Sequence, residues 1–254
     1  MAKNNWTREQ TIIAFNIYCK IPFKKCSKSH PEIIKYSGLI GRSPSALNMK
    51  IGNFGRLDPA LRKRGIVGLA NGGKLEEEIW NEFHGDWDRL AFESEKLLAK
   101  LQNKTIEVSS EITIGNLPQG EERERIVKTR VNQQFFRSAI LASYNQKCCV
   151  TGINLPQLLV ASHIVPWSQN IKERLNPQNG LCLNSLHDKA FDTGLMTVTP
   201  DYEIKFSPIV MGSASGAEIK ELFVGREGGK IILPEKFLPN KEFLDFHYRN
   251  IFKS

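Results

Sequence analysis

The segment between residues 158 and 206 constrains the fold most, because its hydrophobic pattern changes several times over a short length. Two apolar runs of strand length, 158–161 and 180–183, are separated by a polar loop. A helix is predicted to begin at 185–191, and the runs 197–199 and 202–206 flank a Pro200–Asp201 turn. The order strand, loop, strand, helix, hairpin predicts a small mixed domain.

Three polar residues lie at the joints of this pattern. His163 ends the first strand, Asn179 precedes the second by one residue, and His187 lies on the helix, with spacings of 16 and 8 residues. Taken singly, each has an ordinary explanation, such as a hydrogen-bonded histidine or an Asn-Gly turn. A strand pair packed under a helix can bring all three together, so their order favours one site.

The residues around this trio carry a family resemblance. The runs are ASHIVPW at 161–167, NPQNGLCL at 176–183 and LHDKAFD at 186–192. From Gln134 to Met196 the chain resembles the HNH endonucleases of the ββα-metal class. The N-terminal half is similar to a domain found ahead of such nucleases in bacterial restriction-type proteins.

The resemblance implies a role for each residue of the trio. His163 is the expected general base, since a neutral imidazole can take a proton from water. His187 is the expected ligand of one divalent cation, Mg²⁺ or Mn²⁺, which would stabilise the leaving oxygen. Asn179 either fixes the loop that orients His163 or assists at the metal.

The neighbours of the trio leave the metal ligands open. Many relatives have an aspartate directly before the base histidine, whereas this chain has Ser162, a weaker neutral ligand. Asp188, beside His187, is a further metal candidate, and Asp192 is an alternative ligand or a support for the ligands. Lys189 or Arg137 is expected to contact the phosphate.

The cysteines indicate neither a disulfide framework nor a zinc site. Some relatives hold zinc with two Cys-x-x-Cys knuckles, but here the corresponding pairs are Cys148/Thr151 and Leu183/Leu186. One surviving thiol cannot build a tetrathiolate site, so we expect no structural zinc. The five cysteines fit a reducing compartment, and the lack of a long apolar run or a signal peptide predicts a cytoplasmic protein without a membrane span.

The net charge of +8 is concentrated near the N-terminus. Residues 1–74 hold 14 lysines and arginines against three acids, a net charge of +11, whereas residues 75–102 are net acidic. Such a basic segment suits a polyanion such as nucleic acid, although a solvated basic surface is the alternative.

A helix-turn-helix is the predicted form of part of this segment. A helix from Pro31 and a helix over 44–54, capped by Ser43, are joined by a short turn. If the second helix enters DNA, the expected contacts are polar residues on or beside it, namely Arg42, Ser45, Asn48, Lys50, Asn53 and Arg56. Lys189 is the expected contact from the second domain. Plain helix packing is the alternative, and the loop 58–73 either touches phosphate or only connects.

Together these patterns predict an α+β chain with three parts: a helical DNA-binding domain at 1–102, a linker at 103–120 and an HNH nuclease domain at 121–254. The resemblance implies a metal-dependent endonuclease that cuts double-stranded DNA, in restriction against foreign or modified DNA. Cutting both strands with one site per chain requires a homodimer or two successive nicks. The alternatives are a nicking, mobile-element or repair nuclease, and a DNA-binding regulator whose nuclease site has decayed.

Overall fold

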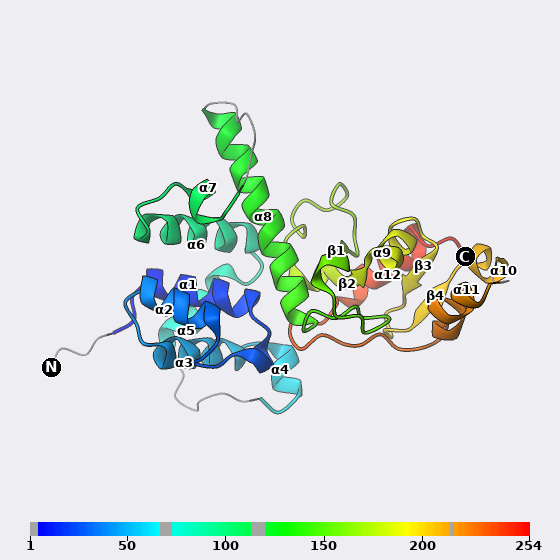
Figure 1. The fold of residues 1–254 in the computed structure, drawn as a ribbon, viewed down its shortest axis with the longest axis horizontal. Helices are drawn as coiled ribbons and strands as arrows, with labels where there is room; N and C mark the ends of the chain where they lie inside the picture. The colour runs from blue at the N-terminus through cyan, green and yellow to red at the C-terminus, as the bar shows by residue number, and fades with distance from the viewer. Residues whose placement is uncertain (1–4, 67–72, 113–119, 214–215) are drawn as a thin grey trace. The chain divides into compact units, whose positions relative to one another are not determined.

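The chain forms two compact units, residues 1–139 and 140–254 (Figure 1). The computed structural model describes residues 5–66, 73–112, 120–213 and 216–254. The division falls within α8 (Glu121–Ser143), the long helix that the sequence predicts. Residues 113–119 of the predicted linker 103–120 lie outside the described residues, and so do residues 67–72 of the loop 58–73.

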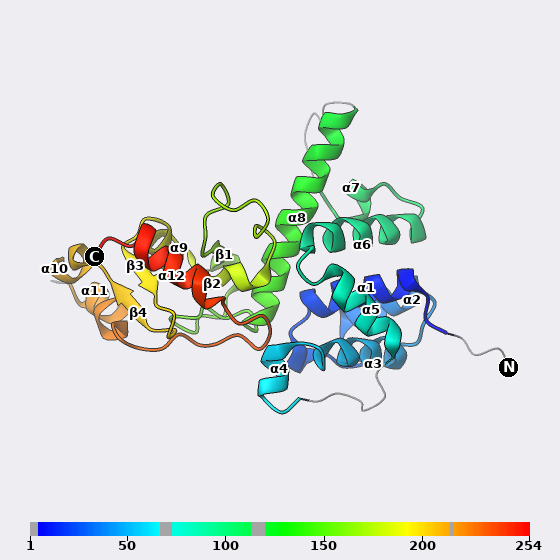
Figure 2. The ribbon, with the colours of Figure 1, turned by 180° about the vertical axis from the view of Figure 1, so that it is seen from behind.

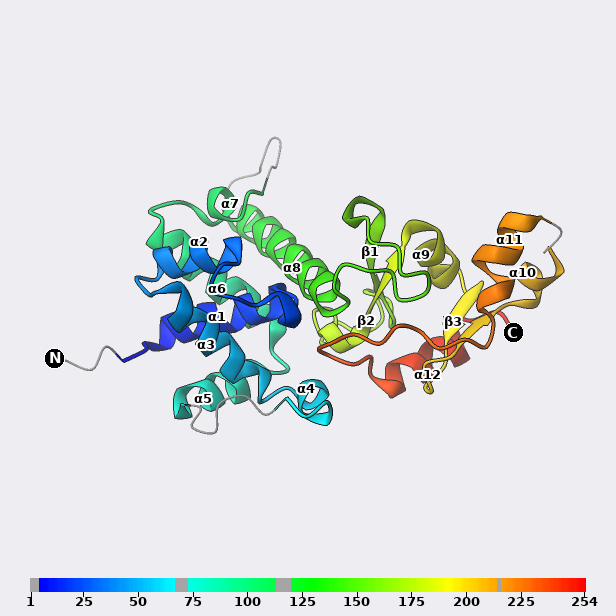
Figure 3. The ribbon, with the colours of Figure 1, turned by 60° about the horizontal axis from the view of Figure 1, so that its bottom comes forward.

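Unit 1 is helical, as predicted, and is organised around α1 (Arg8–Lys20). All residues from Thr11 to Cys19 are buried, because α3, α5 and α6 pack around this helix (Figure 3). The helix begins with the predicted capping box of Thr7 and Gln10. The other elements of the unit are η1 (Phe23–Lys25), α2 (Pro31–Leu39), α3 (Pro44–Gly55), α4 (Pro59–Lys63), α5 (Lys74–Phe83), α6 (Trp87–Leu101) and α7 (Ile106–Ser109).

Aromatic side chains form the centre of unit 1. The Phe15 ring of α1 lies 4.7 Å from that of Phe54 and 5.1 Å from that of Trp80, measured between ring centroids. Leu47, Ile51 and Phe54, the predicted inner face of α3, are fully buried. Packing on α1, more than helix propensity, therefore holds these short helices together.

Two details at the end of α3 were not expected from the sequence. The five-residue helix α4 begins where a loop was predicted, with Asp58 as its cap. The Asp58 carboxylate accepts from the Ala60 N–H at 2.8 Å and from the buried Tyr18 hydroxyl at 2.7 Å. This buried cap fixes the chain just after α3.

Unit 2 contains the predicted strand, loop, strand, helix order (Figure 2). Strand β1 (Leu159–His163) pairs antiparallel with β2 (Gly180–Asn184), and His163 is opposite Gly180. Helix α9 (Ser185–Asp192) follows β2 directly and packs on both strands. The predicted hairpin is β3 (Met196–Val198) with β4 (Ile204–Phe206). This arrangement, together with the helical unit 1, confirms the α+β class.

The remaining elements of unit 2 are η2 (Pro156–Leu158), η3 (Pro177–Asn179), α10 (Pro208–Gly212), α11 (Ala217–Leu222), η4 (Val224–Arg226) and α12 (Lys241–Asn250). Helix α12 packs against β3, and the chain after it crosses Gly194 so closely that a Cβ there would lie 2.1 Å from the Ile251 carbonyl oxygen. Gly194 also has φ +73°, so only glycine fits this crossing. In the described part of the chain, no helix has the length and apolarity needed to cross a membrane.

One buried ion pair joins α3 to α5. Lys50 Nζ lies 2.8 Å from Glu76 Oε1, and both side chains are almost fully buried. Burial alone would raise the pKa of Glu76, but hydrogen bonds from Lys50 and Asn53 outweigh it, and the pKa lies below its usual value. Lys50 therefore stabilises a carboxylate inside the protein.

We predict that Lys50→Ala lowers the free energy of unfolding by about 3–5 kcal/mol, because it leaves the Glu76 charge buried without its cation. The matched control is Lys74→Ala, which removes an exposed cation 3.9 Å from Glu78 on the same helix. That change should cost under about 0.5 kcal/mol. Urea unfolding of the two variants measures the difference, and equal losses would contradict the assignment.

Candidate active site

His163 is held at the end of β1 through one ring nitrogen. Its Nε2 lies 2.8 Å from the carbonyl oxygen of Arg174, and since a carbonyl can only accept, Nε2 carries the proton. In the neutral ring, Nδ1 then has the lone pair that can take a proton. Burial is the main cause that lowers the pKa of His163; the Arg174 carbonyl opposes it and the Arg174 guanidinium adds to it. His163 is therefore neutral near pH 7.

Asn179 fixes the loop that follows His163. Its fully buried amide accepts from the Val165 N–H at 2.8 Å and donates to the carbonyl oxygens of Val165 (3.2 Å) and Glu173 (3.1 Å). The backbone carbonyl oxygen of Asn179 accepts from the Ile164 N–H at 3.0 Å. The amide is thus occupied by backbone groups at both ends of the loop. Of the two roles open to Asn179, the structure supports positioning.

A cleft of about 380 Å³ opens beside His163. Ser162, His163 and Trp167 line it from β1 and the following loop, and Asp188 and Asp192 line it from α9. Because the two aspartates are four residues apart, they share one face of the helix. His247 and Ile251 line the cleft from α12 and the chain after it.

Several polar atoms of this cleft are buried without enough partners to offset their loss of contact with water. Burial raises the pKa of Asp188, with partial relief from the nearby Ser162 hydroxyl and the Lys189 charge. Burial also raises the pKa of Asp192, and the Asp188 charge adds to it. Ser162 Oγ is buried and has no partner in good hydrogen-bond geometry among the described residues. A cation placed between these oxygens would stabilise all of them.

His187 does not line the cleft. Its side chain is fully buried, near the Phe206 and Phe223 rings, and Nε2 lies 2.9 Å from the Leu222 carbonyl oxygen while Nδ1 lies 3.1 Å from Asn184 Oδ1. To bind a cation, this ring would have to give up a partner on one side. The structure therefore does not bring His187 to His163, whereas it does bring Asp188 there.

His187 belongs instead to a hydrogen-bonded network. Asn184 Oδ1 accepts from the His187 N–H at 3.0 Å, and Asn184 Nδ2 donates to Thr151 Oγ1 at 3.3 Å. The network joins the turn after Cys148 to the first turn of α9.

Two residues of the site were not singled out from the sequence. The Arg174 guanidinium lies over the Trp167 ring, 5.0 Å from its centroid, and Arg174 Nε donates to the Trp167 carbonyl oxygen at 2.6 Å. His247 stacks on Phe191 at 3.6 Å, and burial lowers its pKa to about 4. Arg174 lies in the loop between β1 and η3, and His247 lies outside the motif, so no spacing rule pointed to either.

Most of the predicted DNA-binding residues of unit 1 already hold protein partners. Lys50 and Asn53 both bind Glu76, and Arg56 Nη2 lies 2.9 Å from Glu77 Oε1. Arg42 donates to Gln10 Oε1 and to the Asn5 carbonyl oxygen and lies over the Trp6 ring. Of the predicted set, Ser45 is exposed on α3, Asn48 is half-buried there, and Lys189 is exposed on α9.

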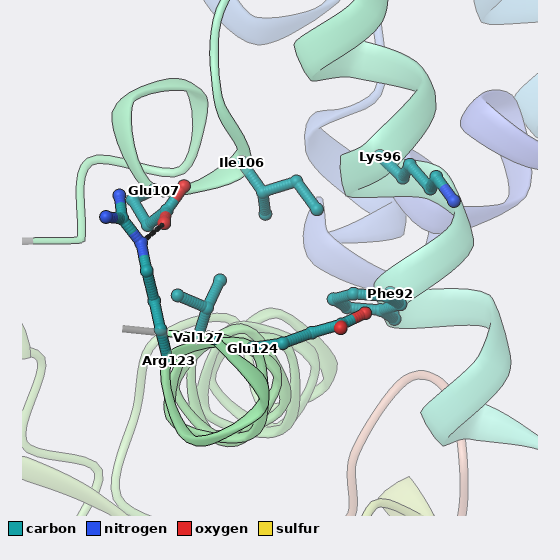
Figure 4. A pocket seen from close by; sticks show the side chains of 8 residues that line it. Phe92, Lys96, Ile106, Glu107, Arg123, Glu124 and Val127 are labelled. Atoms are coloured by element: carbon teal, nitrogen blue, oxygen red, sulfur yellow. Dashed lines mark hydrogen bonds and ion pairs between the residues drawn. The ribbon is translucent and has the colours of Figure 1, made fainter. Parts of the chain in front are cut away.

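A different hollow, of about 230 Å³, lies in unit 1 between α6, α7 and the start of α8 (Figure 4). Its lining includes Glu107 and Arg123, which pair with each other at 2.7 Å. Among the described residues that line it there is neither a histidine nor a cysteine. It offers no candidate for the chemistry found beside His163.

A divalent cation fits the cleft by its donor chemistry. Mg²⁺ and Mn²⁺ prefer oxygen ligands, and Mg²⁺ is commonly held by one or two carboxylates together with phosphate and water. Asp188, Asp192 and the buried Ser162 hydroxyl supply such oxygens. Within the described residues, no group of three or more His, Cys, Asp and Glu side chains is already arranged around one point. Any cation there would need water or phosphate to complete its shell.

Part of the chain that includes this site is similar to a known protein family. No curated protein matches the chain significantly. A family model described as HNH endonuclease, HNH_2, matches residues 148–199, which include β1, Asn179, β2, α9 and β3. The matched segment thus contains His163, Ser162 and both cleft aspartates. By this match, unit 2 carries an HNH endonuclease domain at residues 148–199.

Proposed function

We propose that the chain is a metal-dependent endonuclease that hydrolyses phosphodiester bonds of double-stranded DNA in the cleft beside His163. One observation carries the proposal: a histidine with a fixed tautomer shares a cleft with two carboxylates inside the HNH match. Hydrolysis needs a base for water and a site for the phosphate charge, and this cleft supplies both.

The metal ligands we propose are Asp188 and Ser162, with Asp192 in support, rather than His187. Asp188 lines the cleft and is stabilised by the Ser162 hydroxyl, whereas both ring nitrogens of His187 face protein atoms. A bound Mg²⁺ or Mn²⁺ would neutralise charge on the scissile phosphate and on the leaving oxygen.

His163 acts as general base in this proposal. Its Nδ1 accepts a proton from the attacking water while Nε2 stays bound to the Arg174 carbonyl oxygen. The water oxygen forms a bond to phosphorus as the bond to the leaving oxygen breaks. Asn179 does not touch the substrate; it is a positioning residue that binds the backbone of the same loop at Val165 and at Glu173, the residue before Arg174.

Two cations flank the proposed reaction site. Arg174 Nε is bound to the Trp167 carbonyl, and its Nη groups meet no carboxylate among the described residues, so they are available for phosphate. Lys189 is exposed next to Asp188 and makes no ion pair in the described part of the chain. We assign phosphate binding to both.

The biological setting we propose is restriction of foreign DNA, including DNA with modified bases. It rests on the resemblance of the N-terminal half to domains that precede nucleases in bacterial restriction-type proteins. In this setting, a homodimer or two successive nicks would produce a double-strand break, and unit 1 would bind the DNA.

The first test is nicking of supercoiled plasmid. Wild-type protein with Mg²⁺ or Mn²⁺ should relax the plasmid, EDTA should stop it, and His163→Ala should lose about 10²-fold or more of the rate while still binding DNA. Matched plasmids with and without base modification test the restriction setting. A wild-type protein that binds DNA but never nicks would instead favour the regulator with a decayed site.

We predict opposite effects for the two neighbours on α9. Asp188→Asn should weaken Mn²⁺ binding by at least about tenfold, because ligand charge sets the affinity of hard-cation sites, and should leave stability nearly unchanged. His187→Ala should lower the free energy of unfolding by at least about 1–3 kcal/mol, because Leu222 O and Asn184 lose their partner. Titration calorimetry and thermal unfolding separate the two effects. Loss of Mn²⁺ binding in a folded His187→Ala protein would return the ligand role to His187.

Asn179→Ala is predicted to lower kcat more than it raises KM for DNA, because the loop that orients His163 loses three hydrogen bonds. We also expect a loss of about 1–3 kcal/mol of stability from the buried groups left without partners. Steady-state nicking kinetics, measured at a temperature where the variant is folded, give the effects on kcat and KM separately. A variant with normal kcat would remove Asn179 from the positioning role.

A further inference from the structure

Two groups of cations in unit 1 differ in their partners. Those on α3 are engaged inside the protein: Lys50 is buried against Glu76, and Arg56 pairs with Glu77. To reach DNA, Lys50 would have to leave a buried carboxylate without its charge partner, which is strongly unfavourable. The excess charge that could meet a polyanion must therefore lie elsewhere in the unit.

A second group of cations lies where η1 meets α4. The Phe23 ring packs on Gly55, since a Cβ built there would lie 2.5 Å from Phe23 Cε2 and 3.3 Å from Leu61 Cδ1. Phe23 begins η1 and Leu61 lies in the middle of α4, so this contact brings the two elements together. α4 itself lies at the edge of unit 1, after the end of α3 (Figure 1).

Five exposed basic residues directly follow these two contact residues. They form what we call the η1–α4 patch: Lys24, Lys25, Arg62, Lys63 and Arg64. Lys25 and Lys63 are each two residues from the contact, which is at most about 7.6 Å along the Cα trace. The five positive charges are thus confined to a small area.

Acidic side chains do not neutralise the centre of this patch. Lys25, Arg62 and Lys63 make no ion pair with any carboxylate in the described part of the chain. Asp58 is the one acid in residues 22–28 and 57–66, and it is buried, bound to the Tyr18 hydroxyl and the Ala60 N–H. Lys25, Arg62 and Lys63 therefore offer uncompensated positive charge at this surface.

We propose that the η1–α4 patch, and not the α3 helix, is the surface through which unit 1 binds the phosphate backbone of duplex DNA. The proposal rests on the proposed function, which makes DNA the substrate. Lysine and arginine charges without base-reading partners give contacts that are independent of sequence and sensitive to salt. The patch would supply affinity and position the DNA, whereas selectivity would arise elsewhere.

The test compares two triple variants in the full chain, both in the His163→Ala background. One is Lys25→Gln, Arg62→Gln and Lys63→Gln in the patch. The matched control removes the same charge from exposed lysines at the end of α6 and beyond, with Lys96→Gln, Lys100→Gln and Lys104→Gln. Fluorescence anisotropy gives the Kd for several labelled duplexes between 50 and 200 mM salt, and circular dichroism checks folding.

The patch variant should reduce the slope of log K against log salt by about 2 to 3, since each lost phosphate contact contributes about 0.9. The loss of affinity should be the same for every duplex sequence. The control should keep the wild-type slope. Equal slope changes in the two variants, or no change in the patch variant, would overturn the proposal. Because the readout is binding, a chain that never nicks DNA would refute the proposed function and leave this result interpretable.

Discussion

The buried amide of Asn179 is the interaction on which the cleft depends. It binds the backbone at Val165 and at Glu173, and so closes the loop that leaves β1 and returns to β2. The next residue along, Arg174, offers the carbonyl that fixes the tautomer of His163. A single side chain thereby couples the loop geometry to the protonation pattern of the base. Because the amide is fully buried, water cannot replace these bonds without opening the domain.

Sequence patterns predicted the two strand pairs and α9 of unit 2 and the place of His163 at the end of β1, because strand length, turn residues and motif order are local properties. They did not predict α10, α11 or α12. They did not settle which neighbour on α9 faces the cleft. Adjacent helical residues point about 100° apart, so the phase of the helix decides between His187 and Asp188. That phase is set by tertiary contacts, since His187 inserts between Phe206, Phe223 and the Leu222 carbonyl.

Distant partners explain the other differences between sequence and structure. Lys50 looked like a border residue of a recognition helix, but Glu76, 26 positions later, draws it into the interior. His247 reaches the cleft from α12, 60 positions after His187, and is fixed there by Thr197 and by stacking on Phe191. Helix α4 was not predicted because its cap, Asp58, is supported by a distant residue, Tyr18 of α1. No local pattern contains these pairings.

The charged side chains of this chain also differ in whether they have a buried partner. Charges with a buried partner stabilise the fold. For those without one we propose a role toward the substrate: the aspartates of the cleft would bind a cation, and the cations around the cleft would bind phosphate. We propose that Asp188, and not His187, holds the metal beside His163. Anomalous scattering from a crystal grown with Mn²⁺ locates the ion directly. We expect one peak in the cleft at the Asp188 carboxylate and Ser162 Oγ, with His187 Nε2 still on the Leu222 carbonyl oxygen. A peak bound to His187, with that hydrogen bond broken, would contradict it.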